Sequence, residues 1–268
     1  MKAVFWRILK DRQSVFLVYI LVNIGLLLMY ISLFPSFKDQ SAAMEQLFKS
    51  YPESFLKAFN FDIANFTTIE GFLSTEQFSF MWPLLVVLMS VGFAGTAFAG
   101  EIEKGTIEIL LAQPISRLKL FISRYLAGLA SLVVFVIFSV FIAIPIIEIF
   151  KISYTFENFA TMALLAFLFG LVIYSIGMFL SAIFSDKGKV YFISGALLVV
   201  MYVLNIVSSI KEQLADLKYV SFFYYFNPSK ALIHNQIDHW GYLVFIGISA
   251  VVIVIGAAWF SKRDIMVS

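Results

Sequence analysis

The sequence predicts an all-α integral membrane protein with six transmembrane helices, and three observations support this fold class. Hydrophobic residues make up 61% of the 268 residues and charged residues only 13%, which leaves too little polar surface to cover a soluble globule. The charged residues cluster between long apolar runs that contain none. The length of each run is about 20 residues or more, which a helix needs to cross the hydrocarbon core. The bilayer is therefore the expected solvent for most of the chain.

Six charge-free runs have this length. Each run satisfies its backbone hydrogen bonds as a helix, and the alternating pattern of a membrane β-barrel is absent from the sequence. The whole chain, residues 1–268, is expected to form one transmembrane domain. The predicted spans are residues 14–34, 78–100, 125–147, 158–184, 190–210 and 241–260.

The distribution of charge predicts that both termini are cytoplasmic. With the N-terminus inside, the inner segments hold 12 of the 19 basic residues but only 6 of the 17 acidic residues. Cytoplasmic loops of membrane proteins carry such an excess of Lys and Arg. We therefore expect a multi-pass protein of the cell (plasma) membrane, with the lipid bilayer as its first partner.

Composition also excludes several functions. A net charge of +2 gives no basic surface for nucleic acid, and a chain without cysteine has no disulfide, thiolate catalyst or Cys-based metal site. The six runs contain no acidic or basic residue, whereas proton-coupled carriers and ion pumps place ionisable groups at mid-membrane. Energy for any transport is therefore expected to enter from the cytoplasmic side.

Three segments outside the runs are expected to be at least partly ordered. Residues 1–13 form either an interfacial N-terminal helix or a plain positively charged anchor, and the two interpretations carry equal weight. The outer loop, residues 35–77, contains short amphipathic stretches. The outer aromatic segment, residues 211–240, is rich in rings just before Asn227 and Pro228. It forms either a re-entrant hairpin or an ordinary aromatic belt.

Asn23, Tyr174 and Asn205 are polar residues within the charge-free runs. They are candidates for a substrate pathway, although interhelical hydrogen bonding is the favoured interpretation of such residues. Walls without charge suit amphiphilic or hydrophobic cargo, such as a lipid, a peptide antibiotic or a drug, and disfavour small ions.

The segment between the second and third spans, residues 101–118, is too elaborate for a simple turn. Its apolar residues share one face at helical spacing, which predicts an amphipathic helix at the interface. Gly105 can break the chain before this helix, Thr106 can cap it, and Pro114 suits the first turn of the next helix. On periodicity alone, an interfacial strut is favoured over an element that docks on a soluble partner. The shared face consists of Ile107, Leu110, Leu111, Ile115 and Leu118.

The amino-acid sequence of this segment, EIEKGTIEILLAQPISR, resembles the signature of type-2 ABC exporter permeases. In that family a Glu before Gly-Thr, then Leu-Leu, Pro and Ser-Arg occupy the loop between the second and third spans. The resemblance extends along the chain, through EGFLSTEQFSF to the basic end FSKRDI. The matching positions are Glu101, Glu103, Gly105, Thr106, Glu108, Leu110, Leu111, Pro114, Ser116 and Arg117.

The resemblance implies a permease whose coupling helix is seated on a separate nucleotide-binding subunit. Two permeases, identical or homologous, would assemble with two ABC ATPase subunits, which would bind ATP and Mg and drive export. The three glutamates of the segment would contact the ATPase, with Gly105 and Pro114 at the corners. The pair Leu110-Leu111 would be buried in the ATPase groove or against the spans.

The chain itself has no GxxxxGKS/T phosphate loop. We therefore expect no cofactor in this chain and no ATP hydrolysis by it. The short inner loop at residues 186–189 is either a second docking point or a solvated turn, and the turn is favoured.

A membrane-embedded enzyme and a non-transporting scaffold or sensor are the alternative classes. The sequence has no HExxH, no GxSxG and no acidic cluster at metal-ligand spacing. His234, Asp238 and His239 are the only close set of His and Asp residues, and their neighbours suit an interfacial loop better than a metal site. No catalytic or metal residue is therefore expected. A scaffold would differ from a transporter in showing nucleotide hydrolysis without flux.

Overall fold

The computed structural model of the chain describes residues 2–40, 51, 67–112 and 114–264. Within these ranges every regular element is a helix, and six helical spans are long and apolar enough to cross a membrane. The predicted all-α architecture with six spans is therefore confirmed. Most of the predicted amphipathic stretches of the outer loop, residues 41–50 and 52–66, lie outside the described residues.

Four of the six spans are single long helices close to the predicted runs. They are α1 (Lys2–Asp39), α10 (Phe156–Ile183), α11 (Lys187–Ile210) and α14 (His239–Lys262). Helix α1 continues without a break from the N-terminal stretch into the first span. Residues 2–13 are thus the first turns of a 38-residue helix and not a separate element.

The second span begins and ends earlier than predicted. It consists of α4 (Ile69–Leu73), the π-helical segment η2 (Ser74–Met81) and α5 (Trp82–Gly95). The predicted outer loop therefore ends near residue 68, and residues 69–77 belong to the span. Glu70 lies inside this span, and its buried carboxylate accepts a hydrogen bond from the Thr155 backbone N–H at 2.8 Å. A carboxylate with such a partner can lie inside a span, although hydropathy alone predicts that the span begins later.

The third span also begins earlier than its charge-free run. Helix α8 (Arg117–Phe141) continues into α9 (Ala143–Ile149), and Ser116 caps α8 by accepting a hydrogen bond from the Lys119 backbone N–H at 3.4 Å. Arg124 therefore lies two turns inside the helix and is only 6% exposed. The helices thus extend beyond the charge-free runs and include flanking charges, such as Arg124 in α8 and Glu70 and Glu76 in the second span.

Short helices cover the two ends of the bundle. At one end, α6 (Ala99–Glu103) and α7 (Ile107–Leu111) connect the second span to α8. At the other end, a 3-10 segment η3 (Glu212–Val220), α12 (Phe222–Tyr225) and α13 (Pro228–His234) connect α11 to α14. Segment η3 folds back against α11, and α13 packs on α10 and the start of the second span. The rings of Phe222, Tyr225 and Phe226 are buried in the bundle, so the aromatic segment contributes to the core.

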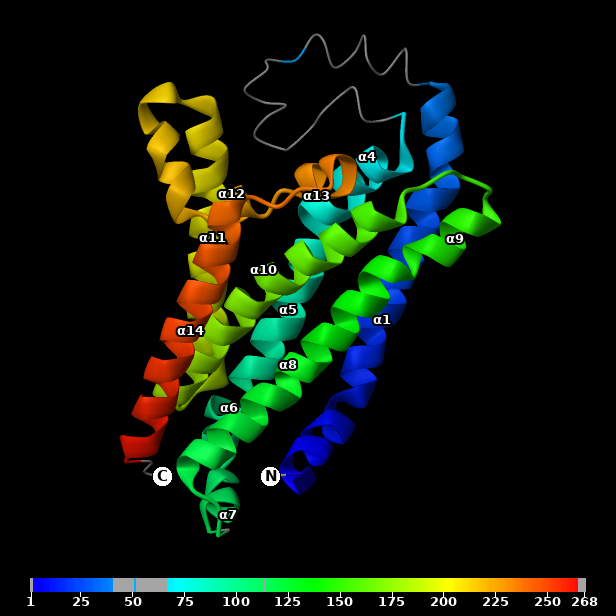
Figure 1. Cartoon of the computed structure of the whole chain (residues 1–268). Helices are drawn as coiled ribbons and strands as arrows, with labels where there is room; N and C mark the ends of the chain where they lie inside the picture. Colours follow the sequence, from blue (N-terminus) through cyan, green and yellow to red (C-terminus); the bar gives the residue numbers. More distant parts are fainter. Residues whose placement is uncertain (1, 41–50, 52–66, 113, 265–268) are drawn as a thin grey trace.

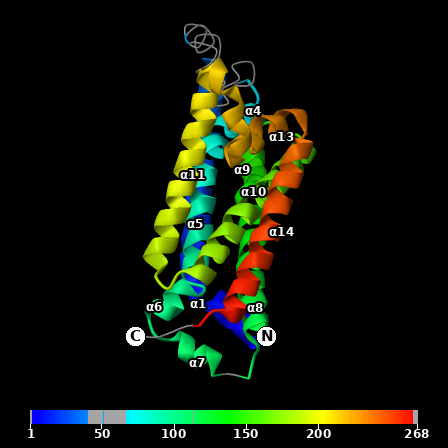
Figure 2. The ribbon, with the colours of Figure 1, turned by 90° about the vertical axis from the view of Figure 1, so that its left-hand side faces the viewer.

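Helix α10 is the centre of the bundle (Figures 1 and 2). It packs against α14, α5, α8 and α11. In the most apolar stretch of α10, 67% of the residues are buried, compared with 17% in that of α1 and 22% in that of α11. The apolar side chains of α1 and α11 thus lie mostly on the surface of the single chain.

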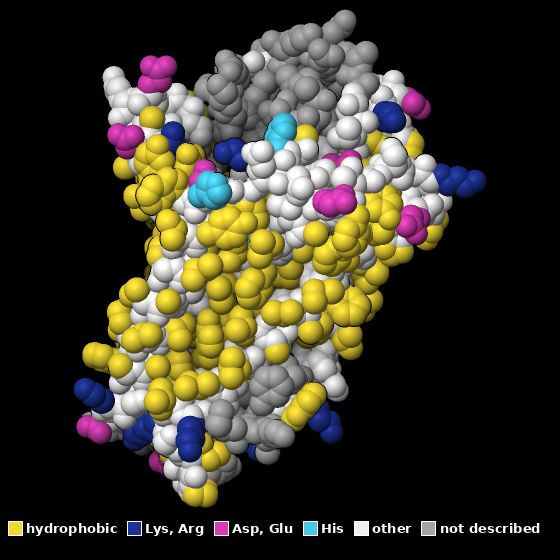
Figure 3. Space-filling model, viewed as in Figure 1, with side chains coloured by type: hydrophobic (Ala, Val, Ile, Leu, Met, Phe, Trp, Pro, Cys, Tyr) yellow, Lys and Arg dark blue, Asp and Glu magenta, His cyan; other side chains and the backbone are white. Residues whose placement is uncertain are grey.

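The surface has the layered charge pattern of a membrane protein. Figure 3 shows a broad band of hydrophobic side chains between two ends where Lys, Arg, Asp and Glu gather. Both chain ends, α6 and α7 lie at one of these ends, and α13 lies at the other (Figure 1). This band can contact lipid without placing charged side chains in the hydrocarbon.

Candidate functional site

The segment from α6 to α7 forms an elbow at the end of the molecule that holds both termini (Figure 2). The elbow turns at Gly105, whose φ of 71° lies in the left-handed region that side chains disfavour. Its backbone N–H donates to the Ile102 carbonyl at 3.0 Å. The prediction that Gly105 breaks the chain before the short helix α7 is therefore confirmed, and the structure adds a second short helix, α6, on its other side.

Thr106 lies at the cap position of α7, but its side chain does not cap that helix. Its hydroxyl donates to the backbone carbonyl of Glu101 at 3.3 Å and contacts the Glu101 carboxylate. The predicted capping role of Thr106 is wrong because the hydroxyl closes the turn back onto α6. Thr106 thus holds the two arms of the elbow together.

The apolar face of the elbow is only partly as predicted. Ile107 is fully buried, and Leu110, Leu111 and Ile115 are half-buried against the core of the bundle. Leu118 is 46% exposed and does not share this burial. Ile109, which the pattern did not single out, is 67% exposed beside the exposed Glu108. The outer face of α7 therefore presents an apolar and an acidic side chain together.

Pro114, Ser116 and Arg117 lie at the corner that follows α7. Pro114 is exposed and precedes the first helical residue, Arg117, so its predicted place in the first turn of the next helix is wrong. The Arg117 guanidinium donates to the backbone carbonyl of Arg263. Arg263 in turn donates to the carbonyls of Ala182 and Phe184 at 2.9 and 3.2 Å. The corner is thus tied to the ends of α14 and α10.

Partial burial lowers the pKa of the Arg263 guanidinium below its ordinary value. Arginine nevertheless stays protonated in proteins, so the charge of Arg263 is retained. Its carbonyl acceptors are the last groups of α10, where a helix has unpaired carbonyl oxygens and a partial negative charge.

Two of the three glutamates of the elbow have partners within the chain. A carboxylate oxygen of Glu101 lies 3.4 Å from an Arg124 guanidinium nitrogen. The Glu103 carboxylate lies 3.5 Å from Lys187 Nζ and also accepts from the Lys187 backbone N–H at 3.1 Å. These pairs connect the elbow to α8 and α11, respectively. Among the three glutamates, Glu108 alone is exposed without an ion pair in the described part of the chain.

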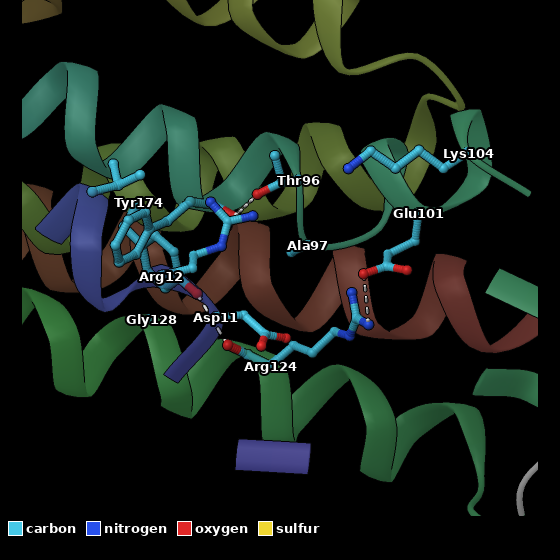
Figure 4. Close-up of a pocket in the computed structure, with 11 residues that line it drawn as sticks. Asp11, Arg12, Thr96, Ala97, Glu101, Lys104, Arg124, Gly128 and Tyr174 are labelled. Carbon is cyan, nitrogen blue, oxygen red and sulfur yellow. Dashed lines mark hydrogen bonds and ion pairs between the residues drawn. The ribbon is translucent and has the colours of Figure 1, made fainter. Parts of the chain in front are cut away.

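A cavity of about 380 Å³ lies behind the elbow, between α1, α5, α8 and α10 (Figure 4). We call it the charged cavity, since three basic and two acidic side chains line it. Asp11 and Lys104 are exposed, so the cavity reaches the surface. Its lining consists of Asp11, Arg12, Val15, Phe93, Thr96, Ala97, Glu101, Lys104, Arg124, Gly128 and Tyr174.

Arg12 and Arg124 enter the charged cavity from α1 and α8 (Figure 4). The Arg12 guanidinium lies 5.1 Å from the centre of the Phe93 ring and donates to the Gly92 carbonyl at 3.4 Å. The Arg124 guanidinium lies 5.5 Å from the Phe98 ring centre. Its buried Nε–H has no acceptor among the described residues. Neither arginine was identified from the sequence, because they lie 112 positions apart and outside the charge-free runs.

Tyr174 of α10 closes one side of the charged cavity. It is 2% exposed, and its hydroxyl donates to the backbone carbonyl of Arg124 at 3.2 Å. Gly128 makes room for this ring, since a Cβ added there would lie 2.1 Å from the Tyr174 hydroxyl oxygen. Tyr174 is thus the one predicted pathway residue that lines the cavity.

A second, smaller hollow of about 200 Å³ adjoins the charged cavity. The two hollows share Arg12 and Phe93. Apart from Arg12, the second hollow is mostly apolar, and we call it the apolar groove. Its lining consists of Arg12, Gln13, Phe16, Phe93, Ala130, Ser131 and Val134.

Asn23 and Asn205 lie away from the charged cavity. The Asn23 side chain donates to the Ser139 carbonyl at 3.2 Å and accepts from Gln77 Nε2 at 2.8 Å. Asn205 is 9% exposed on α11, where its backbone carbonyl accepts from Ser208 and Ser209. The contacts of Asn23 are the interhelical hydrogen bonds that the sequence favoured for such residues.

Asp238 acts as the cap of α14 and accepts from the Trp240 backbone N–H at 3.0 Å. It also lies 3.9 Å from Lys230 Nζ. Among the described residues, no group of three His, Cys, Asp or Glu side chains is placed to hold a metal ion. The Asp238 carboxylate, which lies between the two histidines in the sequence, is instead used as a helix cap and as the partner of Lys230.

Six apolar spans, a structured elbow at the end with both termini and a cavity beside it define a multi-pass helical membrane protein. Residues 5–265 match the family described as ABC-2 family transporter protein, and the chain belongs to this family. No curated relative matches the chain. The protein is thus a multi-pass membrane subunit of an ABC-2 transporter, as the resemblance implied. Permeases of this family generally pair with ATPase subunits.

Proposed function

We propose that the protein is the permease of an ATP-driven exporter and that its elbow is the docking element for a separate ATPase. Cargo of amphiphilic or hydrophobic character would move from the cytoplasm or the inner leaflet to the outside. Two permeases and two ATPases would form the complete transporter. In this arrangement the elbow and both termini lie in the cytoplasm, where the excess of basic residues belongs.

The observation that carries this proposal is the position and bonding of the elbow. It lies at the end of the bundle, presents Glu108 and Ile109 outward, and is bound to two different spans. The Glu101–Arg124 pair reaches α8 and the Glu103–Lys187 pair reaches α11. A displacement of the elbow by the ATPase would therefore reach both spans through direct contacts. Interfaces use such an exposed apolar side chain with a polar rim as an anchor.

The position of the elbow is testable by labelling, since the chain has no cysteine. We expect the variant Glu108→Cys to react with a membrane-impermeant maleimide in inverted membranes and not in intact cells. Glu157→Cys, at the exposed start of α10, should show the opposite pattern. Labelling of Glu108→Cys from outside the cell would contradict the proposal.

Docking is testable by co-purification of the full chain with its ATPase. The variant Ile109→Asp places a charge at the centre of the proposed contact and should reduce the recovered ATPase by at least about tenfold. The matched control is Ile149→Asp, at a similarly exposed isoleucine on the opposite end. Equal recovery with both variants would place the contact elsewhere.

Coupling is testable with Gly105→Val. A β-branched residue at a positive φ costs on the order of 1–2 kcal/mol, so the elbow should change shape while the spans still insert. We expect ATP hydrolysis in proteoliposomes to continue without transport. Gly25→Val is the control, since a Cβ there meets nothing within 4 Å. Normal transport by Gly105→Val would show that the elbow does not transmit movement.

A further inference from the structure

The charged cavity and the apolar groove meet at two side chains. Arg12 and Phe93 each line both hollows. The cavity offers guanidinium groups, while the groove offers Phe16, Ala130 and Val134 along α1 and α8. A polar hollow that continues into an apolar one has the shape and chemistry of a site for a molecule with a charged head and a hydrocarbon chain.

The arginines of the cavity are not solvated anchors. A cationic side chain that only obeys the charge asymmetry of membrane proteins extends its head into water. Arg124 is instead 6% exposed, and its Nε–H has no acceptor among the described residues. Of the five N–H groups of Arg12, one donates to a carbonyl within the described part of the chain, at 3.4 Å. The cavity therefore holds several guanidinium donors that an anion can use.

The charge balance around these donors also favours an anion. Glu101 is the carboxylate that pairs with Arg124, and Asp11 pairs with Arg7 at 3.6 Å. In the described part of the chain no carboxylate lies within ion-pair distance of Arg12. Arg12 is thus the unpaired charge at the junction of the two hollows. Planar guanidinium groups bind phosphate through parallel N–H donors.

The position along the helices matches the headgroup zone. Arg124 lies seven residues after the first residue of α8, which is about 10 Å along the helix axis. Arg12 lies two residues after the start of the first candidate span. A headgroup bound there would leave its chain at the depth of the hydrocarbon, where the apolar groove continues.

We propose that the two hollows form one binding site for an amphiphile with an anionic phosphate headgroup. The phosphate lies between Arg12 and Arg124, and the hydrocarbon chain lies in the apolar groove past Phe16 and Phe93. That this ligand is the cargo rests on the proposed export function; binding of the ligand does not. Tyr174 closes the cavity on the side of α10, and Gly128 of α8 leaves room for its ring.

The experiment is a lipid titration of the purified full chain in a neutral detergent, with bound molecules counted by native mass spectrometry. The probes are phosphatidylglycerol, phosphatidylcholine with the same chains, and inorganic phosphate. We expect phosphatidylglycerol to bind more tightly than either of the other two. Tight binding of inorganic phosphate without a preference for phosphatidylglycerol would assign the site to a free anion and overturn the proposal.

Two variants separate the two halves of the site. Arg12→Gln should weaken phosphatidylglycerol binding roughly tenfold or more, the loss expected for a charged hydrogen bond, and Arg12→Lys should lie between this variant and the parent. Ala130→Trp fills the groove and should weaken binding of phosphatidylglycerol while leaving binding of inorganic phosphate unchanged. The control is Lys10→Gln, at an exposed lysine on the same helix.

An equal effect of Lys10→Gln and Arg12→Gln would mean that only the general positive charge matters, and it would overturn the site. Thermal unfolding of each variant identifies a fold defect. Where Arg12→Gln unfolds early, Ala130→Trp provides the deciding measurement. Specific lipid binding without any ATP-driven flux in proteoliposomes would contradict the export function and leave the site intact.

Discussion

Two polar regions lie between α1, α8 and the second span, and they use polarity in different ways. The neutral cluster consists of Asn23, Gln77, Trp82 and Ser139, which bond to one another across three spans. The charged cavity contains two arginines, one carboxylate partner and open space. Asn23, Gln77 and Trp82 of the first region each donate to a protein acceptor, and Gln77 Oε1 alone lacks a partner there among the described residues. The second region instead keeps guanidinium donors available.

The difference separates structural polarity from functional polarity. Hydrogen bonds between helices stabilise a bundle in lipid, where the alternative is an unpaired polar group. Charged groups with unused donors cost free energy and are kept where they bind something. We therefore expect substitutions in the neutral cluster to reduce stability, and substitutions in the charged cavity to reduce ligand binding.

The largest loss of stability is expected for Trp82→Ala in the neutral cluster. Trp82 is fully buried, stacks on Phe135 and Phe226, and donates from Nε1 to Ser139 Oγ at 2.8 Å. Removing a buried Trp side chain should cost about 3–5 kcal/mol of unfolding free energy. The measurement is reversible unfolding in mixed lipid–detergent micelles. Trp259→Ala, at a 54% exposed tryptophan, should change stability by only about 0.5 kcal/mol.

A smaller loss is expected for Gly128→Ala at the wall of the charged cavity. The new methyl group would overlap the Tyr174 ring, and overpacking of this kind costs about 1–3 kcal/mol. Gly195→Ala, with open space around its Cα, should not destabilise the protein. A double variant with Tyr174→Ala should be more stable than the sum of the single effects. Simple additivity would show that Gly128 and Tyr174 do not contact each other in the membrane.

Asn23→Ala should cost about 1 kcal/mol, because it removes two hydrogen bonds of the neutral cluster but no ring packing. Ser32→Ala is the matched control, since the Ser32 hydroxyl is exposed and donates only within its own helix. The same unfolding assay measures both. A loss for Ser32→Ala as large as that for Asn23→Ala would remove the distinction between interhelical and local hydrogen bonds.

The spans could be predicted because their apolar runs are continuous, and the elbow because Gly105 is flanked by a recognisable pattern. The ends of the second and third spans could not. Glu76 and Arg124 bound the charge-free runs in the sequence, yet both lie inside helices, as does Glu70. Distant groups bond to two of these side chains, the Thr155 backbone N–H to Glu70 and Glu101 to Arg124. A sequence window contains only local residues, so it does not register such partners.

The charged cavity was not predictable for the same reason. It combines residues of four spans, and its two arginines come from segments that each resemble an ordinary basic flank. The ion pairs that Glu101 and Glu103 form with basic residues of the same chain were also not predictable. Two acidic side chains are equally suited to contact a partner subunit. What the sequence did provide was Tyr174, as a polar ring inside an apolar run.

The smallest change in stability is expected for Arg12→Gln, and this variant gives the sharpest test of the comparison. Arg12 has no carboxylate partner among the described residues, and its hydrogen bond to the Gly92 carbonyl is long at 3.4 Å. The cation–π contact with Phe93 contributes about 0.5–1 kcal/mol, which the removal of a partly buried charge offsets. The net loss of unfolding free energy should therefore stay below the about 1 kcal/mol expected for Asn23→Ala.

Arg124→Gln provides the contrast within the same cavity. Its loss leaves the Glu101 carboxylate without its cationic partner, so the unfolding free energy should fall by more than in Arg12→Gln. The two variants should therefore separate in the unfolding assay although both remove one arginine from the same cavity. If Arg12→Gln destabilises the protein as much as Asn23→Ala or more, Arg12 belongs with the structural groups, and the division between the two polar regions fails.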